Sequence, residues 1–248
     1  PPPPLLTRPA APPHLHSFPT RRSSDLRAEL ALEAGGLDWN IVRANWFMQN
    51  FSESFMIEGI LNGELMLPAD DIVEPFIDID DIAEVAVATL TRPELRNRVF
   101  EVSGPRAMTF AECVAAISEA TGYPVKYTQI PIEDFIDGLR VQGAPEPLLW
   151  LMRELFTVVF DGRNSRPTGG VEEALGRPAT DFDEYLRKRA ARAGAHRNTG
   201  TFLRLEREES HTVVVFRDKV SGTEMRLKTK YVSGADGARA NVARQEVP

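Results

Sequence analysis

Aromatic and amide side chains follow a short apolar run near residue 40, in a pattern suited to binding a planar small molecule. Trp39, Ile41 and Val42 alternate as in a strand, after a turn at 35–36. The segment that comes next contains Arg43, Asn45, Trp46, Phe47, Gln49 and Asn50. Rings there can stack on a planar group, and amides can bind its polar edge, at the rim of a cleft in an α/β sheet. An ordinary strand-to-helix junction with core aromatics explains the same residues, and composition alone favours that simpler interpretation.

Alternating strands and helices are expected after this segment. Predicted strands cover 64–67, 98–103 and 125–130, and amphipathic helices cover 50–61, 82–90 and 109–121. Thr109 and Glu112 have the spacing of a capping box. Pro147 opens an apolar helix that extends to Phe160 and is expected to be buried against the sheet. This order predicts an α/β fold, the C-terminal half of a Rossmann-like doubly wound sheet.

Three carboxylates crowd the start of the helix predicted at 82–90, namely Asp78, Asp80 and Asp81. Carboxylates at a helix start accept hydrogen bonds from free backbone N–H groups and interact favourably with the helix dipole. Asp81 and Glu84 also have capping-box spacing. A metal site is the alternative, but no histidine lies nearby in the sequence, and capping explains the acids without a metal.

The chain changes character towards both ends. Residues 1–26 are rich in proline, and the stretch HSFPTRRSSDL at 16–26 looks like a translated sequencing adapter. This leader is therefore expected to be disordered and artefactual, with a basic tail or transit peptide as the alternative. Strands predicted at 199–206, 212–218 and 224–232 are joined by polar turns and form a small antiparallel meander. The expected divisions are 1–26, 27–194 and 195–248.

Composition and charge exclude several classes of protein. The net charge of −7 argues against binding of nucleic acid through its phosphates. The single cysteine, Cys113, excludes a disulfide framework and a cysteine metal cage, and fits a reducing, cytoplasmic location. No apolar run has the length of a membrane span. A small-molecule substrate is the expected partner, and self-association through an exposed sheet edge is a further expectation.

Residues 27–190, and chiefly 36–185, resemble the C-terminal half of the NmrA-like NAD(P)H-binding family, the atypical short-chain dehydrogenase/reductases. The resemblance lies in GLDWNIVRANWFMQNF, LPADDIVEPFIDIDDIAEVAVATL, FEVSGPRAMTFAECVAAISEATGYPV and EALGRPATDF, which occur in the family's order. Such proteins reduce quinones, azo dyes or triphenylmethane dyes, or sense NADP without turnover. The resemblance implies NADP or NAD as cofactor near Arg43, Trp46 and Phe47. It also implies a substrate beside Trp46, Gln49 and Asn50.

Two features usually sought in dinucleotide-binding reductases are absent from the sequence. It contains no G-x-G-x-x-G run, and without such a loop at a helix start pyrophosphate has no site. Tyr185 is followed four residues later by Arg189 rather than by a lysine, although the atypical members also lack that pair. Ala44 stands where the family usually has proline after the arginine. The sequence as printed is therefore expected to be a fragment that is inactive alone.

Residues 197–248 resemble a fragment of an FAD-dependent aromatic-ring monooxygenase of the hydroxybenzoate hydroxylase type. The resemblance lies in a strand followed by GADGARANVAR, where the family has G-A-D-G-A-R-S-x-x-R. It implies FAD as cofactor near Asp236, Gly237 and Arg239, with a plain Asp-Gly turn as the alternative. A reductase, a sensor of NADP, a monooxygenase fragment and an assembly chimera all remain open. We expect a reductase origin for the middle segment and a chimera for the whole chain.

Overall fold

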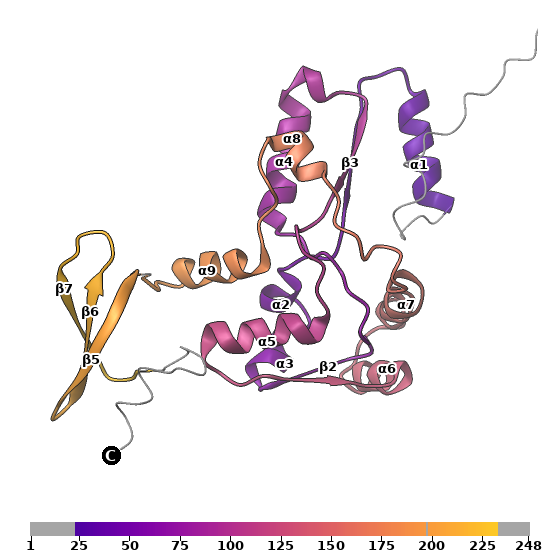
Figure 1. Cartoon of the computed structure of the whole chain (residues 1–248). Helices are drawn as coiled ribbons and strands as arrows, with labels where there is room; N and C mark the ends of the chain where they lie inside the picture. Colours follow the sequence, from indigo (N-terminus) through magenta and orange to yellow (C-terminus); the bar gives the residue numbers. More distant parts are fainter. Residues whose placement is uncertain (1–22, 197, 233–248) are drawn as a thin grey trace, which may run out of the picture. The chain divides into compact units, whose positions relative to one another are not determined.

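The computed structural model describes residues 23–196 and 198–232, with side chains described from residue 27 onwards (Figure 1). The chain divides into two compact units. One contains Pro1–Ala115 and Val125–Tyr185, and the other contains Ala116–Pro124 and Leu186–Pro248. Within the described residues, no helix is long and apolar enough to cross a membrane.

Two pairs of parallel strands form the sheets of the first unit. Strand β1 (Asn40–Ala44) pairs with β3 (Arg98–Val102), and β2 (Glu64–Leu67) pairs with β4 (Lys126–Gln129). Parallel pairing needs a crossover connection between the strands, and helices supply it here. The strands predicted from sequence at 64–67, 98–103 and 125–130 are confirmed to within about two residues.

At least one helix follows each strand of the first unit, and Figure 1 shows the helices along the colour sequence from indigo to orange. They are α1 (Ser23–Ala34), α2 (Asn50–Glu53), α3 (Ile57–Leu61), α4 (Ile79–Thr91), the 3₁₀ turn η2 (Pro93–Leu95), α5 (Phe110–Thr121), α6 (Ile132–Val141), α7 (Glu146–Glu154), the π turn η3 (Leu155–Val159), α8 (Gly170–Leu175) and α9 (Phe182–Arg192). The predicted mixed α/β class is confirmed.

The core of the first unit has two parts. An aliphatic part joins α4, β3 and α8, and there Gly170 lies so close to the backbone of Glu101 that a Cβ atom would be 2.3 Å from its carbonyl oxygen. An aromatic part gathers rings from segments far apart in the sequence, with centroids 5.1 Å apart for Phe76 and Phe110 and 5.3 Å apart for Phe51 and Phe76. Edge-to-face packing of such rings is favourable beyond the burial of their area.

Local signals place most of the helix starts correctly. Thr109 and Glu112 form the predicted capping box: the Glu112 amide donates to Thr109 Oγ1 at 3.1 Å, and the Thr109 amide donates to Glu112 Oε2 at 2.8 Å. The continuous helix predicted at 50–61 is wrong. It is split into α2 and α3 because Ser54 takes an extended conformation, with φ −123° and ψ −164°.

The apolar helix predicted at 148–160 differs from expectation in two ways. It begins at Glu146, and its last turn is the π turn η3, in which the Phe160 amide donates to the Leu155 carbonyl at 2.9 Å. Only one side of α7 is buried, at Leu149 and Met152, while Trp150 is 51% exposed. The helix is amphipathic rather than buried all round, because polar residues share its turns.

The second unit contains the predicted meander. Strands β5 (Gly200–Glu208), β6 (His211–Asp218) and β7 (Glu224–Thr229) form an antiparallel sheet in the order β5-β6-β7. One face buries Val213 and Val215. On the same face Arg204 forms salt bridges with Glu206 and Glu224. The apolar stems of these long side chains can cover the valines.

Candidate functional site

A cavity of about 370 Å³ lies in the first unit where the chain leaves the C-terminal end of β1. Ligand sites in α/β folds form at this end of parallel strands. Most of the wall is apolar, and the polar groups are three asparagines and one serine. The lining residues are Ala44, Asn45, Trp46, Phe47, Asn50, Ser54, Phe55, Met152, Leu155, Val159 and Asn164.

Trp46 belongs both to the core and to the cavity wall. Its side chain is 8% exposed, and its ring meets Phe110 edge-on with centroids 5.3 Å apart. Phe47, the next residue, is 39% exposed. Backbone hydrogen bonds hold this turn: the Ile77 amide donates to the Trp46 carbonyl and the Met48 amide to the Ile77 carbonyl, each at 2.8 Å. Both interpretations of these aromatics, core and cleft wall, therefore describe part of the structure.

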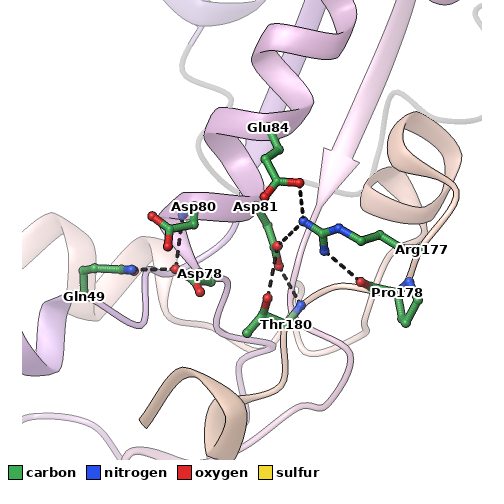
Figure 2. Close-up of polar contacts among 8 residues, drawn as sticks. All are labelled: Gln49, Asp78, Asp80, Asp81, Glu84, Arg177, Pro178 and Thr180. Carbon is green, nitrogen blue, oxygen red and sulfur yellow. Dashed lines mark hydrogen bonds and ion pairs between the residues drawn. The ribbon is translucent and has the colours of Figure 1, made fainter. Parts of the chain in front are cut away.

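Gln49 holds the start of α4 and does not line the cavity. Its Nε2 atom donates to Asp78 Oδ1 at 2.6 Å (Figure 2). Its Oε1 atom accepts from the Ile79 amide at 3.0 Å. Asp78 is the N-cap of α4 and accepts from the Asp80 amide. Because both ends of the Gln49 amide are engaged, this side chain fixes the turn that carries Trp46 and Phe47.

The capping box predicted for Asp81 and Glu84 is wrong. Asp81 is fully buried, and Figure 2 shows its carboxylate between Thr180 and Arg177. The Thr180 amide donates to Asp81 Oδ2 at 2.6 Å, and Arg177 donates to Asp81 Oδ1 at 2.9 Å and to Glu84 Oε2 at 2.6 Å. The hydrogen bond to Glu84 is the main reason that the pKa of Arg177 is raised. These acids join α4 to the segment 177–180, which lies about a hundred residues further along the chain than Asp81.

Arg43 also lies outside the cavity lining. It stands opposite Glu101 in the register of β1 and β3, and its guanidinium bonds Glu101 at 2.9 Å and Glu29 of α1 at 2.6 Å. Burial opposes the charge, but the hydrogen bonds to both glutamates raise the pKa of Arg43 overall. The arginine thus connects α1 to the sheet. Of the predicted site residues, Trp46, Phe47 and Asn50 come together at the cavity, whereas Arg43 and Gln49 do not.

A buried carboxyl group and two asparagines form a polar cluster that the sequence reasoning missed. Glu74 is fully buried, and neither carboxyl oxygen makes a hydrogen bond of normal geometry within the described residues. Burial raises the pKa of Glu74 to about 8, the charge of Asp161 adds to the rise, and the Asn45 amide opposes it. Asn45 in turn donates to the backbone carbonyl of Asn164 at 3.3 Å.

The far wall of the cavity was also missed. Met152, Leu155 and Val159 come from α7 and η3, about a hundred residues after β1. The spacing of these apolar residues in the sequence predicts a helix, but it does not predict which part of the protein the helix packs against. The residues predicted to contact FAD, namely Asp236, Gly237 and Arg239, lie outside the described residues. Groups of three or more acidic, histidine or cysteine side chains that could hold a metal are absent from the part of the chain that the structure describes.

The fold is that of an α/β protein with a cavity at the end of a parallel strand. Residues 26–186 match the NmrA-like family, and the chain belongs to that family. An NAD(P)H azoreductase of Xenophilus azovorans is 34% identical over 167 residues, which cover 66% of this chain and 57% of the azoreductase. The chain thus spans a little over half the length of that relative.

A solved structure confirms the fold. An NADPH-dependent quinone oxidoreductase from Escherichia coli superposes with a TM-score of 0.60 at 20% identity, covering 67% of this chain and 60% of that protein. At this level of identity the likeness concerns the fold, which is the Rossmann-like fold expected from the sequence.

The C-terminal part of the chain matches a different family. Residues 152–248 match the FAD binding domain. A geranylgeranyl diphosphate reductase of Rhodobacter capsulatus is 60% identical over 68 residues, which cover 27% of this chain and 17% of that enzyme. The two family matches overlap at 152–186. The resemblance of the tail to a flavin-binding protein is therefore confirmed.

Proposed function

We propose that residues 27–194 form the acceptor-binding side of an NAD(P)H-dependent reductase for planar, conjugated small molecules such as quinones or azo compounds. The cavity at the end of β1 carries this proposal, because its lining combines Trp46 and Phe47 with amide groups. Aromatic walls bind flat apolar ligands, and a few polar groups fix their orientation. Membership of the NmrA-like family and the azoreductase relative support the same chemistry.

The residues of the chain do not fit the pyrophosphate of a dinucleotide. The 248 residues contain no G-x-G-x-x-G run. Gly169 is the N-cap of α8 and Gly170 is its first residue, but Gly170 packs against the backbone of Glu101, so its lack of a side chain serves packing. A phosphate needs exposed backbone N–H groups at a helix start. We therefore propose that the sequence as printed binds no dinucleotide by itself and is inactive alone, as a fragment of such a reductase.

The contribution of this chain is then the orientation of the acceptor and the exclusion of water from it. Trp46 is held by ring contacts and by the hydrogen bond that its backbone carbonyl accepts from the Ile77 amide, so its indole offers a fixed wall. Phe47 is more exposed and stands in the same wall. Asn50, at the start of α2, supplies an amide to the same cavity.

Isothermal titration calorimetry with menadione, NADPH and FAD tests the proposal. Menadione is expected to bind with a dissociation constant of tens of micromolar, and Trp46→Ala is expected to weaken binding at least tenfold, an effect of roughly 1.4 kcal/mol. Trp150→Ala serves as the matched control, because Trp150 is half exposed and does not line the cavity. NADPH and FAD are expected to give no measurable heat. Micromolar binding of NADPH or FAD would contradict the proposal that the chain binds no dinucleotide by itself. Absence of menadione binding would contradict the proposal that the cavity binds the acceptor.

A second candidate concerns the tail alone. The match of residues 152–248 to the FAD binding domain favours an origin in a flavoprotein for the meander and the residues after it. We propose that Asp236, Gly237 and Arg239 belong to its flavin-contacting segment. Limited proteolysis followed by mass spectrometry tests whether residues 195–248 form a domain separate from 27–194. Protection of a single fragment that crosses residue 194 would contradict that division.

A further inference from the structure

One buried acceptor group in the cavity wall has no donor among the residues that the structure describes. Asn164 lies between η3 and α8, lines the cavity and is 6% exposed. Its Oδ1 atom is buried and makes no hydrogen bond within the described residues. Buried side-chain oxygens almost always accept a hydrogen bond, so an unpaired one in a cavity wall indicates a place for a donor from a ligand or a water molecule.

The position of Asn164 is fixed by its neighbour Asn45. The Asn45 amide donates from Nδ2 to the Asn164 backbone carbonyl at 3.3 Å, and its Oδ1 accepts from the Trp46 amide at 2.8 Å. The Asn45 backbone amide donates in turn to the Val102 carbonyl at 3.1 Å, at the end of β3. Because Asn45 is fully engaged, Asn164 is the buried amide in this wall that still has an unused acceptor.

Apart from Asn45, Asn50 and Ser54, the remainder of the wall is apolar. Trp46 and Phe47 come from the turn after β1, and Met152, Leu155 and Val159 come from α7 and η3. A flat aromatic ring suits this surface, and one polar substituent on the ring can reach the amide end. A carbonyl or ether oxygen cannot satisfy the Asn164 acceptor, whereas a hydroxyl or N–H group can.

We propose that the cavity selects aromatic compounds that carry a hydroxyl or N–H group, which donates a hydrogen bond to Oδ1 of Asn164. This inference rests on the proposed function, in that it names the substrate class of the same cavity. Asn164 is a specificity-determining residue in this account and takes no part in proton or electron transfer. An aromatic ligand without a donor still enters the cavity, but it leaves the buried oxygen unpaired and binds more weakly.

A matched pair of ligands tests the inference on the full chain. Calorimetric dissociation constants are measured for 1-naphthol and for 1-methoxynaphthalene, which keeps the oxygen but lacks the donor. We expect 1-naphthol to bind about tenfold more tightly to the wild type. In Asn164→Leu that ratio is expected to fall to about one, and in Asn164→Asp, which keeps an acceptor, it is expected to persist.

Asn62→Leu is the matched control, because it makes the same change at an exposed residue away from the cavity. Thermal melting of each variant verifies that it is folded. Equal affinity of the two ligands for the wild type overturns the inference, whatever the variants do, and so does a ratio that persists in a folded Asn164→Leu. If neither naphthalene binds the wild type, the proposed cavity function fails together with the inference. Binding of menadione with no preference between the naphthalenes overturns the inference alone.

Discussion

Replacing Glu74 with glutamine removes a titrating group from the interior of the first unit. The carboxyl group is fully buried without a hydrogen bond of normal geometry, and burial raises its pKa from 4.5 to about 8. In the unfolded chain the same group is exposed to water and has an ordinary pKa. The folded protein therefore holds one more proton than the unfolded chain at every pH between these two values, and unfolding releases that proton.

The sign and size of the effect follow from this proton. Because the folded state binds the extra proton, Glu74 contributes stability at acid pH that is lost as the pH rises towards 8. The loss is about 1.4 kcal/mol per pH unit within the interval. From pH 5 to pH 7.5 it amounts to about 3 kcal/mol, allowing for partial titration at both ends. Glu74→Gln has nearly the same shape as the neutral acid and should not show this loss.

Urea unfolding followed by tryptophan fluorescence measures the effect. All three tryptophans, at positions 39, 46 and 150, belong to the first unit, so the signal reports its unfolding. The free energy of unfolding of Glu74→Gln relative to wild type is expected to increase by about 3 kcal/mol between pH 5 and pH 7.5. Glu94→Gln, at an exposed position, controls for the general effect of removing a carboxylate. A difference between Glu74→Gln and wild type that is the same at both pH values would refute the reasoning.

Three further substitutions test the elements that hold the site, each by urea unfolding. Gln49→Leu leaves the Ile79 amide without its side-chain partner, and we expect the free energy of unfolding to fall by about 2 kcal/mol. An unchanged urea midpoint would contradict the role of Gln49 in holding the start of α4. Thr109→Ala removes the cap of α5 and is expected to cost about 1 kcal/mol, whereas Thr109→Ser should cost much less. Gly170→Ala places a Cβ atom against the Glu101 carbonyl and is expected to cost about 2 kcal/mol, despite the better helix propensity of alanine. A gain in stability there would contradict the close approach.

Local signals in the sequence account for much of the fold. Glu64–Leu67 is bounded by Gly63 and Pro68, and the strand occupies the predicted residues. The pair Thr109 and Glu112 identifies the start of α5, since both partners of the capping box lie within one turn. Signals of this kind depend on neighbours in the chain, so sequence alone can reveal them.

The site depends on contacts between distant residues, which sequence alone does not reveal. The spacing of Asp81 and Glu84 suits a capping box, yet Asp81 is held by Thr180, ninety-nine residues away. Gln49 has the composition of a ligand-binding residue, but Asp78 uses its amide. Glu74 lies in a polar stretch that resembles a surface loop, and only the tertiary structure shows that it is buried.

The central claim is that the cavity at the end of β1 binds an aromatic ligand against Trp46. A variant with Trp39→Phe and Trp150→Phe leaves Trp46 as the single tryptophan, and titration with 1,4-naphthoquinone then reports on this one ring. We predict quenching that saturates as for a single binding site. In the added variant Val159→Phe, saturation is expected to need a higher ligand concentration, because the larger side chain fills part of the cavity. Quenching that rises linearly without saturation, as for free tryptophan in solution, would contradict the account.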